Sequence, residues 1–275
     1  MKNFTNTYIF VFASVMVIVV AAILSLVASL LKPIQNKNEE LEKMKSILAS
    51  VHIESTAKNA EELFQKYIPE SYVINPEGDK ISNLNAFDVD MTKQQNKIQE
   101  IKQLESSLGE KVESPFKKFM SKFIEFKGID TKKVIAKKSE EEKERQLPVY
   151  ICNKENETYY IFPLRGKGLW GPIWGYVALK PDMNTIYGVT FDHKTETPGL
   201  GAEISTLGFQ QQFTNKKLLK DGKFVSIDVA KGGASPEDIN AVDAISGGTI
   251  TSKGLQKMLF NCLSSYQKYF ELKRN

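Results

Sequence analysis

The sequence predicts an α+β protein in which a single N-terminal transmembrane helix precedes a soluble domain with an antiparallel-type sheet and packed helices. Three observations predict this fold class. Residues 8–31 carry no charged side chain, short β-rich runs recur from Val149 onward, and apolar residues near the C-terminus are spaced three and four apart. The domains that we expect are a short cytoplasmic N-terminus at 1–7, the membrane helix at 8–31, a helical extension with the N-terminal part of the soluble domain at 32–148, and the domain core at 149–275.

The apolar segment at 8–31 is long enough to cross a membrane. Fifteen of its residues are Ile, Leu, Val or Phe, and about 20 helical residues span a hydrocarbon core of ~30 Å. A cleaved signal peptide is the alternative, but its apolar region is usually roughly 7 to 15 residues long. No clear small-x-small site precedes Lys32. The sequence therefore favours an uncleaved anchor.

The charges that flank this segment do not settle its orientation. Lys2 and the amino terminus precede it, and four lysines follow it, at positions 32, 37, 43 and 45. The positive-inside rule therefore does not favour a cytoplasmic N-terminus, although large domains are translocated largely regardless of nearby charge.

The sequence after the apolar segment, from 33 to about 145, is predicted to be mainly helical. Residues 33–49 place Leu41, Met44 and Leu48 on one side of a charged helix, and an extended piece at 71–74 leads into a turn at 75–78. Residues from about 91 to 145 are rich in Lys, Glu and Gln, and their apolar positions predict amphipathic helices: Ile98, Ile101, Leu104, Leu108, Phe116, Phe119, Met120 and Phe123. The mixed charges at 137–145 are typical of a solvated face or linker.

The C-terminal half alternates between short strands and helices. Five β-rich runs, broken by glycine, proline and Asp-Gly, are predicted as strands at 149–152, 159–162, 174–179, 185–191 and 224–229. Helices are predicted after Gly199 and after Thr249. The second has one apolar face, made of Leu255, Met258, Leu259, Cys262, Leu263, Tyr266 and Phe270.

Composition excludes some functional classes. The 37 basic and 33 acidic residues are interspersed and give a net charge of only +4, so we expect no nucleic-acid binding. Cys152 and Cys262 lack the paired spacing of metal ligands, so no metal site is predicted and both are interpreted as core residues. An oxidising compartment would permit a disulfide between them, but the sequence does not show that they lie close enough.

The run 243–249, Asp-Ala-Ile-Ser-Gly-Gly-Thr, places the Thr249 hydroxyl on a glycine turn just before the last helix. Amides at a helix N-terminus and in such a turn favour a phosphate. Gly247 and Gly248 let the backbone approach a ligand closely, and Thr251 or Ser252 could cap the helix. A plain turn with a cap is the structural alternative.

Three further loops carry candidate binding groups. The loop 165–171 contains Leu169 and Trp170, whose indole could cover one face of a flat ligand. The run 193–201 contains Glu196 and Thr197 beside a proline and glycines that force a turn, and Lys231 precedes Gly232 and Gly233, where its charge could neutralise a phosphate. The alternatives are a core or rim Trp170, a solvated loop acid at Glu196, an incidental His193 and a plain hairpin turn at 231–234.

These four runs, in this order behind one apolar anchor, resemble the FMN-binding domain family, and within it the family of the C subunits of sodium-translocating NADH:quinone oxidoreductases. The matching pieces are Pro-Glu-Gly-Asp at 76–79, Gly-Lys-Gly-Leu-Trp at 166–170, Glu-Thr-Pro-Gly-Leu-Gly at 196–201, Lys-Gly-Gly-Ala at 231–234, and the run ending at Thr249 with Thr251 and Ser252 after it. The family's flavinylation motif usually has Ala where this chain has Gly248. The helical stretch at about 91–145 is longer than the family core needs.

The resemblance implies one covalent FMN per chain, esterified through its phosphate to Thr249 by a separate flavin transferase. It implies that Ser246, Gly247 and Gly248 shape the turn. The ring or phosphate would be contacted by Leu169, Trp170, Glu196, Thr197, Leu200, Gly201 and Lys231. None of these is implied to be a general acid or base, so no catalytic residue is predicted.

The resemblance also implies an electron carrier in a membrane complex that oxidises NADH, reduces ubiquinone and exports sodium ions. The other membrane subunits of that complex would be the partners, in a bacterial inner membrane, with the soluble domain facing the periplasm. No Gly-x-Gly-x-x-Gly fingerprint occurs, so another subunit would oxidise NADH. Two alternatives stay open: the G subunit of a ferredoxin:NAD-linked electron-transport complex, and a flavin-free membrane-anchored scaffold.

Overall fold

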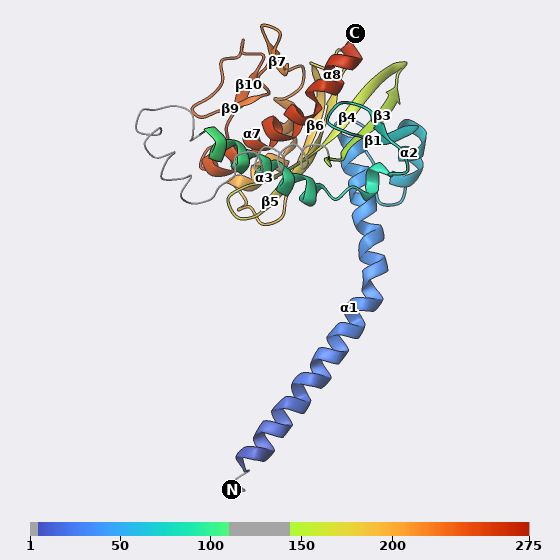
Figure 1. Ribbon diagram of the computed structural model, residues 1–275, viewed down its shortest axis with the longest axis vertical. Coiled ribbons are helices and arrows are strands. Elements are labelled where there is room, and N and C mark those ends of the chain that lie inside the picture. The colour runs from blue at the N-terminus through green and yellow to red at the C-terminus, as the bar shows by residue number, and fades with distance from the viewer. Residues whose placement is uncertain (1–4, 110–143, 275) are drawn as a thin grey trace. The chain divides into compact units, whose positions relative to one another are not determined.

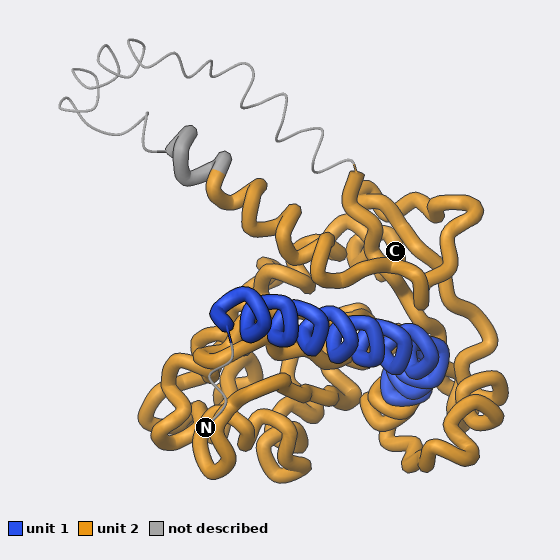
Figure 2. Tube along the Cα trace, turned by 90° about the horizontal axis from the view of Figure 1, so that it is seen from below, with its two compact units in different colours: residues 1–44 blue, residues 45–275 orange. Residues whose placement is uncertain are grey.

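The computed structural model describes residues 5–109 and 144–274, with only the backbone described at 104–109 (Figure 1). The chain divides into two compact units, residues 1–44 and residues 45–275 (Figure 2). Helix α1 (Asn6–Ser50) contributes to both.

Helix α1 confirms the predicted N-terminal apolar helix. It is 45 residues long and contains an 18-residue window with a mean hydropathy of 3.0, so it is long and apolar enough to cross a membrane. It continues through Pro33, where the missing N–H removes one helical hydrogen bond. The helix expected at 33–49 is therefore the second half of α1 and not a separate element. Its last residues, Ile47, Leu48 and Ser50, are buried.

The second unit is built on one antiparallel sheet of six strands in the order β2-β1-β3-β4-β5-β6. The strands are β1 (Glu70–Ile74), β2 (Lys80–Ile81), β3 (Leu147–Lys154), β4 (Glu157–Lys167), β5 (Pro172–Leu179) and β6 (Ile186–His193). The first four β-rich runs of the C-terminal half lie in β3 to β6, so the predicted antiparallel α+β fold is confirmed. Glu155 and Asn156, both with φ near 60°, form the tight turn between β3 and β4.

Each edge of this sheet is short or partly covered by other segments of the chain. Strand β2 has only two residues, paired with Val73 and Ile74 of β1. At the other edge, the Ile186 N–H donates to the Lys216 carbonyl at 2.8 Å, and the Asn215 N–H donates to the Ile186 carbonyl at 2.8 Å. The start of β6 is thus covered by the segment at 215–217, and farther along β6 the Gln210 amide donates to the Phe191 carbonyl at 3.1 Å.

The sheet is covered on both faces. Alternate residues of β3 to β6, including Phe162 and Val177, share one core with helix α7 (Thr249–Leu263) and helix α8 (Gln267–Arg274), which follow each other through the 3-10 turn η3 (Ser264–Tyr266) (Figure 1). On the opposite face, the ring of Tyr150 contacts Phe64 of α2 (Ala60–Tyr67) and Phe87 of η1 (Ala86–Asp88). The end of α1 packs there as well, since the Thr190 hydroxyl donates to the Ser46 carbonyl at 3.1 Å.

The remaining elements lie between β6 and α7. They are η2 (Gly201–Ser205), α6 (Leu207–Gln211), the hairpin of β7 (Leu219–Lys220) and β8 (Lys223–Phe224), and the parallel pair of β9 (Asp228–Ala230) and β10 (Ala241–Asp243). The prediction of one strand at 224–229 is wrong, because Ser226 adopts a φ of 63° and separates β8 from β9.

Helix α3 (Met91–Gly109) confirms the start of the amphipathic region, with Ile98 and Ile101 buried. Residues 110–143, including the predicted apolar positions from Phe116 to Phe123, lie outside the described residues.

Candidate flavin site at the start of helix α7

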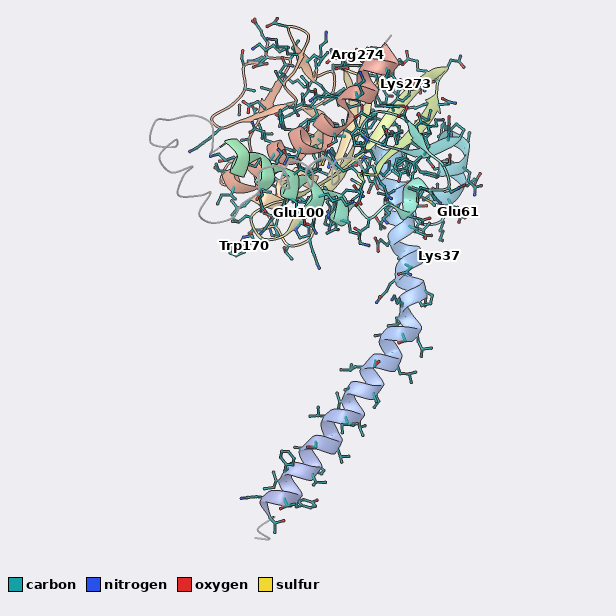
Figure 3. All side chains as sticks on the ribbon, in the orientation of Figure 1. Lys37, Glu61, Glu100, Trp170, Lys273 and Arg274 are labelled. Atoms are coloured by element: carbon teal, nitrogen blue, oxygen red, sulfur yellow. The ribbon has the colours of Figure 1, made fainter. Side chains whose placement is uncertain are left out.

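A cavity of about 240 Å³ opens where two loops meet the N-terminus of α7. Its walls are Leu169, Trp170, Glu196, Thr197, Leu200, Gly201, Gly247, Gly248, Thr249, Ile250 and Thr251. All but the last two are residues that the sequence singled out as cofactor contacts, drawn from runs about 80 positions apart at their extremes. The Trp170 side chain projects outward with 67% of its surface exposed (Figure 3).

The turn that carries Thr249 runs directly from a strand into a helix. Strand β10 ends at Asp243, and the Ala244 N–H donates to the Ala230 carbonyl at 3.0 Å, which extends the pairing with β9. The Gly248 N–H then donates to the Ile245 carbonyl at 3.0 Å and closes the turn. Gly247 has a φ of 72°, a conformation that glycine adopts without the steric cost that other residues incur.

Helix α7 begins at Thr249 and has Gly248 at its N-cap, without a side-chain cap. The prediction that Thr251 or Ser252 caps it is therefore wrong. The Thr251 hydroxyl instead donates to Glu196 Oε2 at 2.5 Å, and Ser252 Oγ accepts from the Ile245 N–H at 3.1 Å. Both side chains tie the turn to its surroundings.

The first-turn amides of α7 remain open. The first hydrogen bond that closes the helix runs from the Ser252 N–H to the Gly248 carbonyl, at 2.9 Å. The N–H groups of Thr249, Ile250 and Thr251 have no acceptor in the described part of the chain. Three such donors and the positive end of the helix dipole favour a phosphate beside the half-buried Thr249.

Glu196 connects the two loops to the helix. Its Oε1 accepts from the Trp170 N–H at 2.9 Å and from the Gly171 N–H at 3.3 Å, while its Oε2 accepts from Thr251. Only 5% of its surface is exposed, so the interpretation as a solvated loop acid is wrong. The incidental role suggested for His193 is also wrong, because its Nδ1 accepts from the Glu196 N–H at 3.2 Å.

Glycines around Glu196 leave the space that its carboxylate occupies. A Cβ on Gly168 would lie 2.5 Å from Glu196 Oε1. A Cβ on Gly201 would overlap Glu196 Oε2 and would lie 2.5 Å from the Thr251 hydroxyl oxygen. The second glycine of each run, Gly168 and Gly201, is thus packed against one buried carboxylate, which leaves no room for a side chain at either position.

Gly248, the departure from the family motif, has a specific neighbour. Its φ of −100° is accessible to any residue, but a Cβ there would lie 2.9 Å from Ile245 Cγ2 and 3.1 Å from Ile245 Cβ. These atoms sit close to the backbone and cannot swing away. Glycine at 248 is therefore matched to the β-branched residue at 245.

The chain is similar to one known domain family and to proteins and structures of known families. The FMN-binding domain family matches residues 168–264. The C subunit of the Na(+)-translocating NADH-quinone reductase of Haemophilus ducreyi is 30% identical over 240 residues, which are 86% of this chain and 82% of that protein. The corresponding protein of Vibrio vulnificus is also 30% identical over 240 residues, with 87% and 83% covered.

Two crystal structures share the fold. The C subunit from Parabacteroides distasonis has a TM-score of 0.67 and 35% identity, covering 87% of this chain and 96% of that one. The Shewanella oneidensis NqrC has a TM-score of 0.60 and 25% identity, covering 86% and 99%. The chain belongs to the NqrC family, the C subunits of Na(+)-translocating NADH-quinone reductases.

The part that matches the FMN-binding domain family begins at Gly168 and so contains every residue that lines the cavity. The residues present fit FMN: the open amides and the Thr249 hydroxyl suit a phosphate, and exposed Leu169, Trp170 and Leu200 would give apolar contact to a flat ring. Among the described residues no cluster of potential metal ligands occurs.

Two of the predicted contact residues do not line the cavity, and two residues that do line it were not predicted. Ser246 and Lys231 are exposed and do not line the cavity, although the loop of Lys231 adjoins the turn, since the Ala234 N–H donates to Asp243 Oδ1 at 2.7 Å. Their contacts with FMN remain predictions. Ile250 and Thr251 line the cavity but were not predicted as ligand contacts. Both lie in the first turn of the helix predicted after Thr249, and that position was the sequence signal that could have identified them.

Both cysteines are buried and unpaired. Cys262 lies on the sheet side of α7, where its Sγ donates to the Arg165 carbonyl and accepts from the Arg165 N–H, both at 3.4 Å. Burial raises the pKa of Cys262 and of Cys152 to about 11. The interpretation of both as core residues is confirmed, and they form no disulfide.

Proposed function

We propose that this chain is the FMN-carrying electron-transfer subunit of a sodium-translocating NADH:quinone oxidoreductase, with FMN esterified through its phosphate to Thr249 Oγ1. The observation that carries this proposal is the position of Thr249, in the wall of the cavity and at the first turn of α7, beside three open amides. A phosphoester formed there would place its negative charge at the positive end of the helix.

Each wall of the cavity has a separate task in this proposal. The amides of Thr249 to Thr251 bind the phosphate, and Leu169, Trp170 and Leu200 provide the apolar contact that orients the ring. Glu196 holds the Trp170 loop against α7 through its three hydrogen bonds. FMN, when bound, supplies the one-electron redox chemistry, and the protein fixes its position and its environment.

The partners and the location follow from the family. The relatives are named as subunits of the Na(+)-translocating NADH-quinone reductase, so we propose the other membrane subunits of that complex as partners and a flavin transferase as the maturation enzyme. Helix α1 would anchor the chain in a bacterial inner membrane with the domain in the periplasm. A covalent link would keep FMN on a domain that the cytoplasm cannot resupply.

The test is mass spectrometry of the peptide that contains Thr249, from full-length protein expressed with its membrane partners and the flavin transferase. The expected result is the added mass of one esterified FMN on Thr249. Two matched variants accompany it: Thr249→Ala, which should carry no covalent FMN, and Thr206→Ala, which removes an exposed threonine hydroxyl outside the cavity and should keep the ester on Thr249.

An unmodified Thr249, with the transferase active on a control substrate, would contradict the proposal and favour the flavin-free scaffold. FMN on Thr251 in the Thr249→Ala protein would show that the first-turn amides, rather than the Thr249 position, select the acceptor. Lys231→Ala tests the predicted phosphate contact. An unchanged or higher content of covalent FMN per chain in this variant would show that Lys231 does not belong to the site.

A further inference from the structure

A second cavity, of about 410 Å³, lies along the outer face of the same helix. It is bounded by α7, by the segment at 225–228 and by Lys102 of α3. Its walls are Lys102, Val225, Ser226, Ile227, Asp228, Lys253, Gln256, Lys257, Phe260 and Asn261. The proposed flavin attachment uses none of them.

The charge of this cavity is predominantly positive. Lys253 and Lys257 are exposed and follow Thr249 at successive four-residue intervals, so they lie along one stripe of α7. Lys102 reaches the cavity from α3, where its ammonium lies 5.5 Å from the centroid of the Phe260 ring and contacts Asn261 Oδ1. Asp228 is the one acidic residue among the residues that line it.

The cavity also has exposed apolar walls. Val225 and Phe260 are exposed, although both belong to the residue types that usually lie inside a domain. Phe260 is held in place by the ring of Phe224, with centroids 5.7 Å apart. Exposed apolar groups surrounded by charge are typical of a docking site for another protein.

Ser226 adds an independent observation. It has a φ of 63°, uncommon for a residue other than glycine, and its hydroxyl is buried with no hydrogen-bond partner among the described residues. Strained backbone and unpaired buried polar groups both occur preferentially at functional sites. Here they coincide with the larger of the two cavities along α7.

From this combination we propose that the outer face of α7 docks an acidic segment of another subunit of the membrane complex. One apolar side chain of that segment would enter the cavity beside Val225 and Phe260, and its flanking carboxylates would pair with Lys253 and Lys257. The choice of a protein partner rests on the proposed function, which makes this chain one subunit of several. A flat lipid surface would not need a hollow with apolar walls.

The test uses the full complex, purified through a tag on this chain, with the other subunits quantified per chain by mass spectrometry. Lys253→Glu with Lys257→Glu should lower their recovery by roughly tenfold, because two favourable charge pairs become repulsive. Recovery with the native chain should fall as salt rises, since exposed charge pairs are screened. Val225→Ser should cause a smaller loss that salt does not change.

The matched control is Lys58→Glu with Lys66→Glu, which reverses two exposed charges elsewhere on the domain and should leave recovery unchanged. Unchanged recovery in the Lys253 and Lys257 variant at low and high salt would overturn the proposal, and so would an equal loss in the control. A loss seen only when anionic phospholipid is present would assign the site to lipid and overturn it as well.

FMN on Thr249, measured on the same samples, separates this proposal from the proposed function. The Lys257→Glu single variant, which keeps Lys253 beside Thr249, should carry as much FMN as the native chain. If the native chain carries none, the proposed function fails, while the recovery of the other subunits still decides whether the outer face of α7 is a docking site.

Discussion

The two cavities along α7 differ in the groups that line them. The cavity at Thr249 combines glycines, threonine hydroxyls and first-turn amides with apolar side chains such as Leu169 and Trp170, and its one charged wall residue, Glu196, is buried and holds three hydrogen bonds. The cavity along the outer face is lined by long charged side chains around exposed Val225 and Phe260. Backbone donors fixed by a helix suit a permanently attached group, whereas exposed lysines around apolar side chains suit the acidic surface of a protein partner.

Helix α7 is common to both cavities, so displacing it should damage both. A Cβ on Gly254 would overlap the Lys167 carbonyl oxygen of β4 and approach Gly168 Cα at 3.3 Å. Gly254→Val should therefore destabilise the domain by about 3 kcal/mol. For a domain of this size that lowers the melting temperature by roughly 6–12 °C.

The matched control for Gly254 is Gly208→Val in α6, where an added Cβ meets nothing within 4 Å. Its melting temperature, by differential scanning calorimetry, should stay within a few degrees of the native value. Equal melting temperatures for the two variants would mean that α7 does not need close contact with β4.

Removing Glu196 should damage only the cavity at Thr249. Glu196→Ala leaves the Trp170 N–H, the Gly171 N–H and the Thr251 hydroxyl without their acceptor, at a cost of about 2 kcal/mol. Covalent FMN per chain should fall, while recovery of the other subunits through the outer face should not. Glu203→Ala is the control, since that carboxylate accepts one bond, from the Gly199 N–H. Full flavinylation of Glu196→Ala would contradict the positioning role.

Changing Gly248 to the family's usual Ala should be harmful in this chain. Gly248→Ala should cost about 1 kcal/mol because its Cβ meets Ile245 Cγ2. Ile245→Ala removes that methyl group, so the double variant should be more stable than the sum of the single effects predicts. Thermal unfolding of the four proteins, with FMN content measured in parallel, tests this coupling. Strict additivity would show that the two positions are independent.

The face of α7 that packs on the sheet and its outer face should also differ in the reactivity of cysteine thiols. This is the smallest of the expected effects, and it involves little change in stability. Iodoacetamide at neutral pH should leave native Cys262 and Cys152 unmodified, because burial limits access and raises each thiol pKa to about 11. A cysteine introduced by Lys257→Cys on the outer face should react readily, as intact-mass measurement would show. Rapid modification of Cys262 would mean that α7 separates from β4 in the native state.

The sequence predicts the regular parts of the fold because hydrophobic periodicity reports which faces are buried. Strands β3 to β6 and the apolar face of α7 are long enough for that signal. The run Phe-Val-Ser-Ile-Asp-Val at 224–229 has the same alternation, yet Ser226 turns the chain there. No residue type in that run demands a positive φ, so tertiary contacts decide the break.

The candidate site is predictable in a different way. Its full list of residues came from a family resemblance, whereas residue chemistry alone indicated the phosphate-binding turn at Thr249 and candidate contacts such as Trp170 and Lys231, each with a structural alternative. The burial of Glu196 could not be predicted, because two of its three partners are backbone amides 25 and 26 positions away. The absence of a side-chain cap on α7 could not be predicted either. Thr251 and Ser252 are good capping residues, but each hydroxyl forms a hydrogen bond with another group.

The protected edges of the sheet have a consequence for how the protein behaves in concentrated solution. Antiparallel sheets with long free edges template the addition of strands from other molecules, the first step toward aggregates. Here one edge ends in the two-residue strand β2, which carries Lys80, and the start of the other pairs with residues 215–217. With these parts of its edges occupied, the sheet presents fewer open backbone groups to which a strand of another molecule could pair.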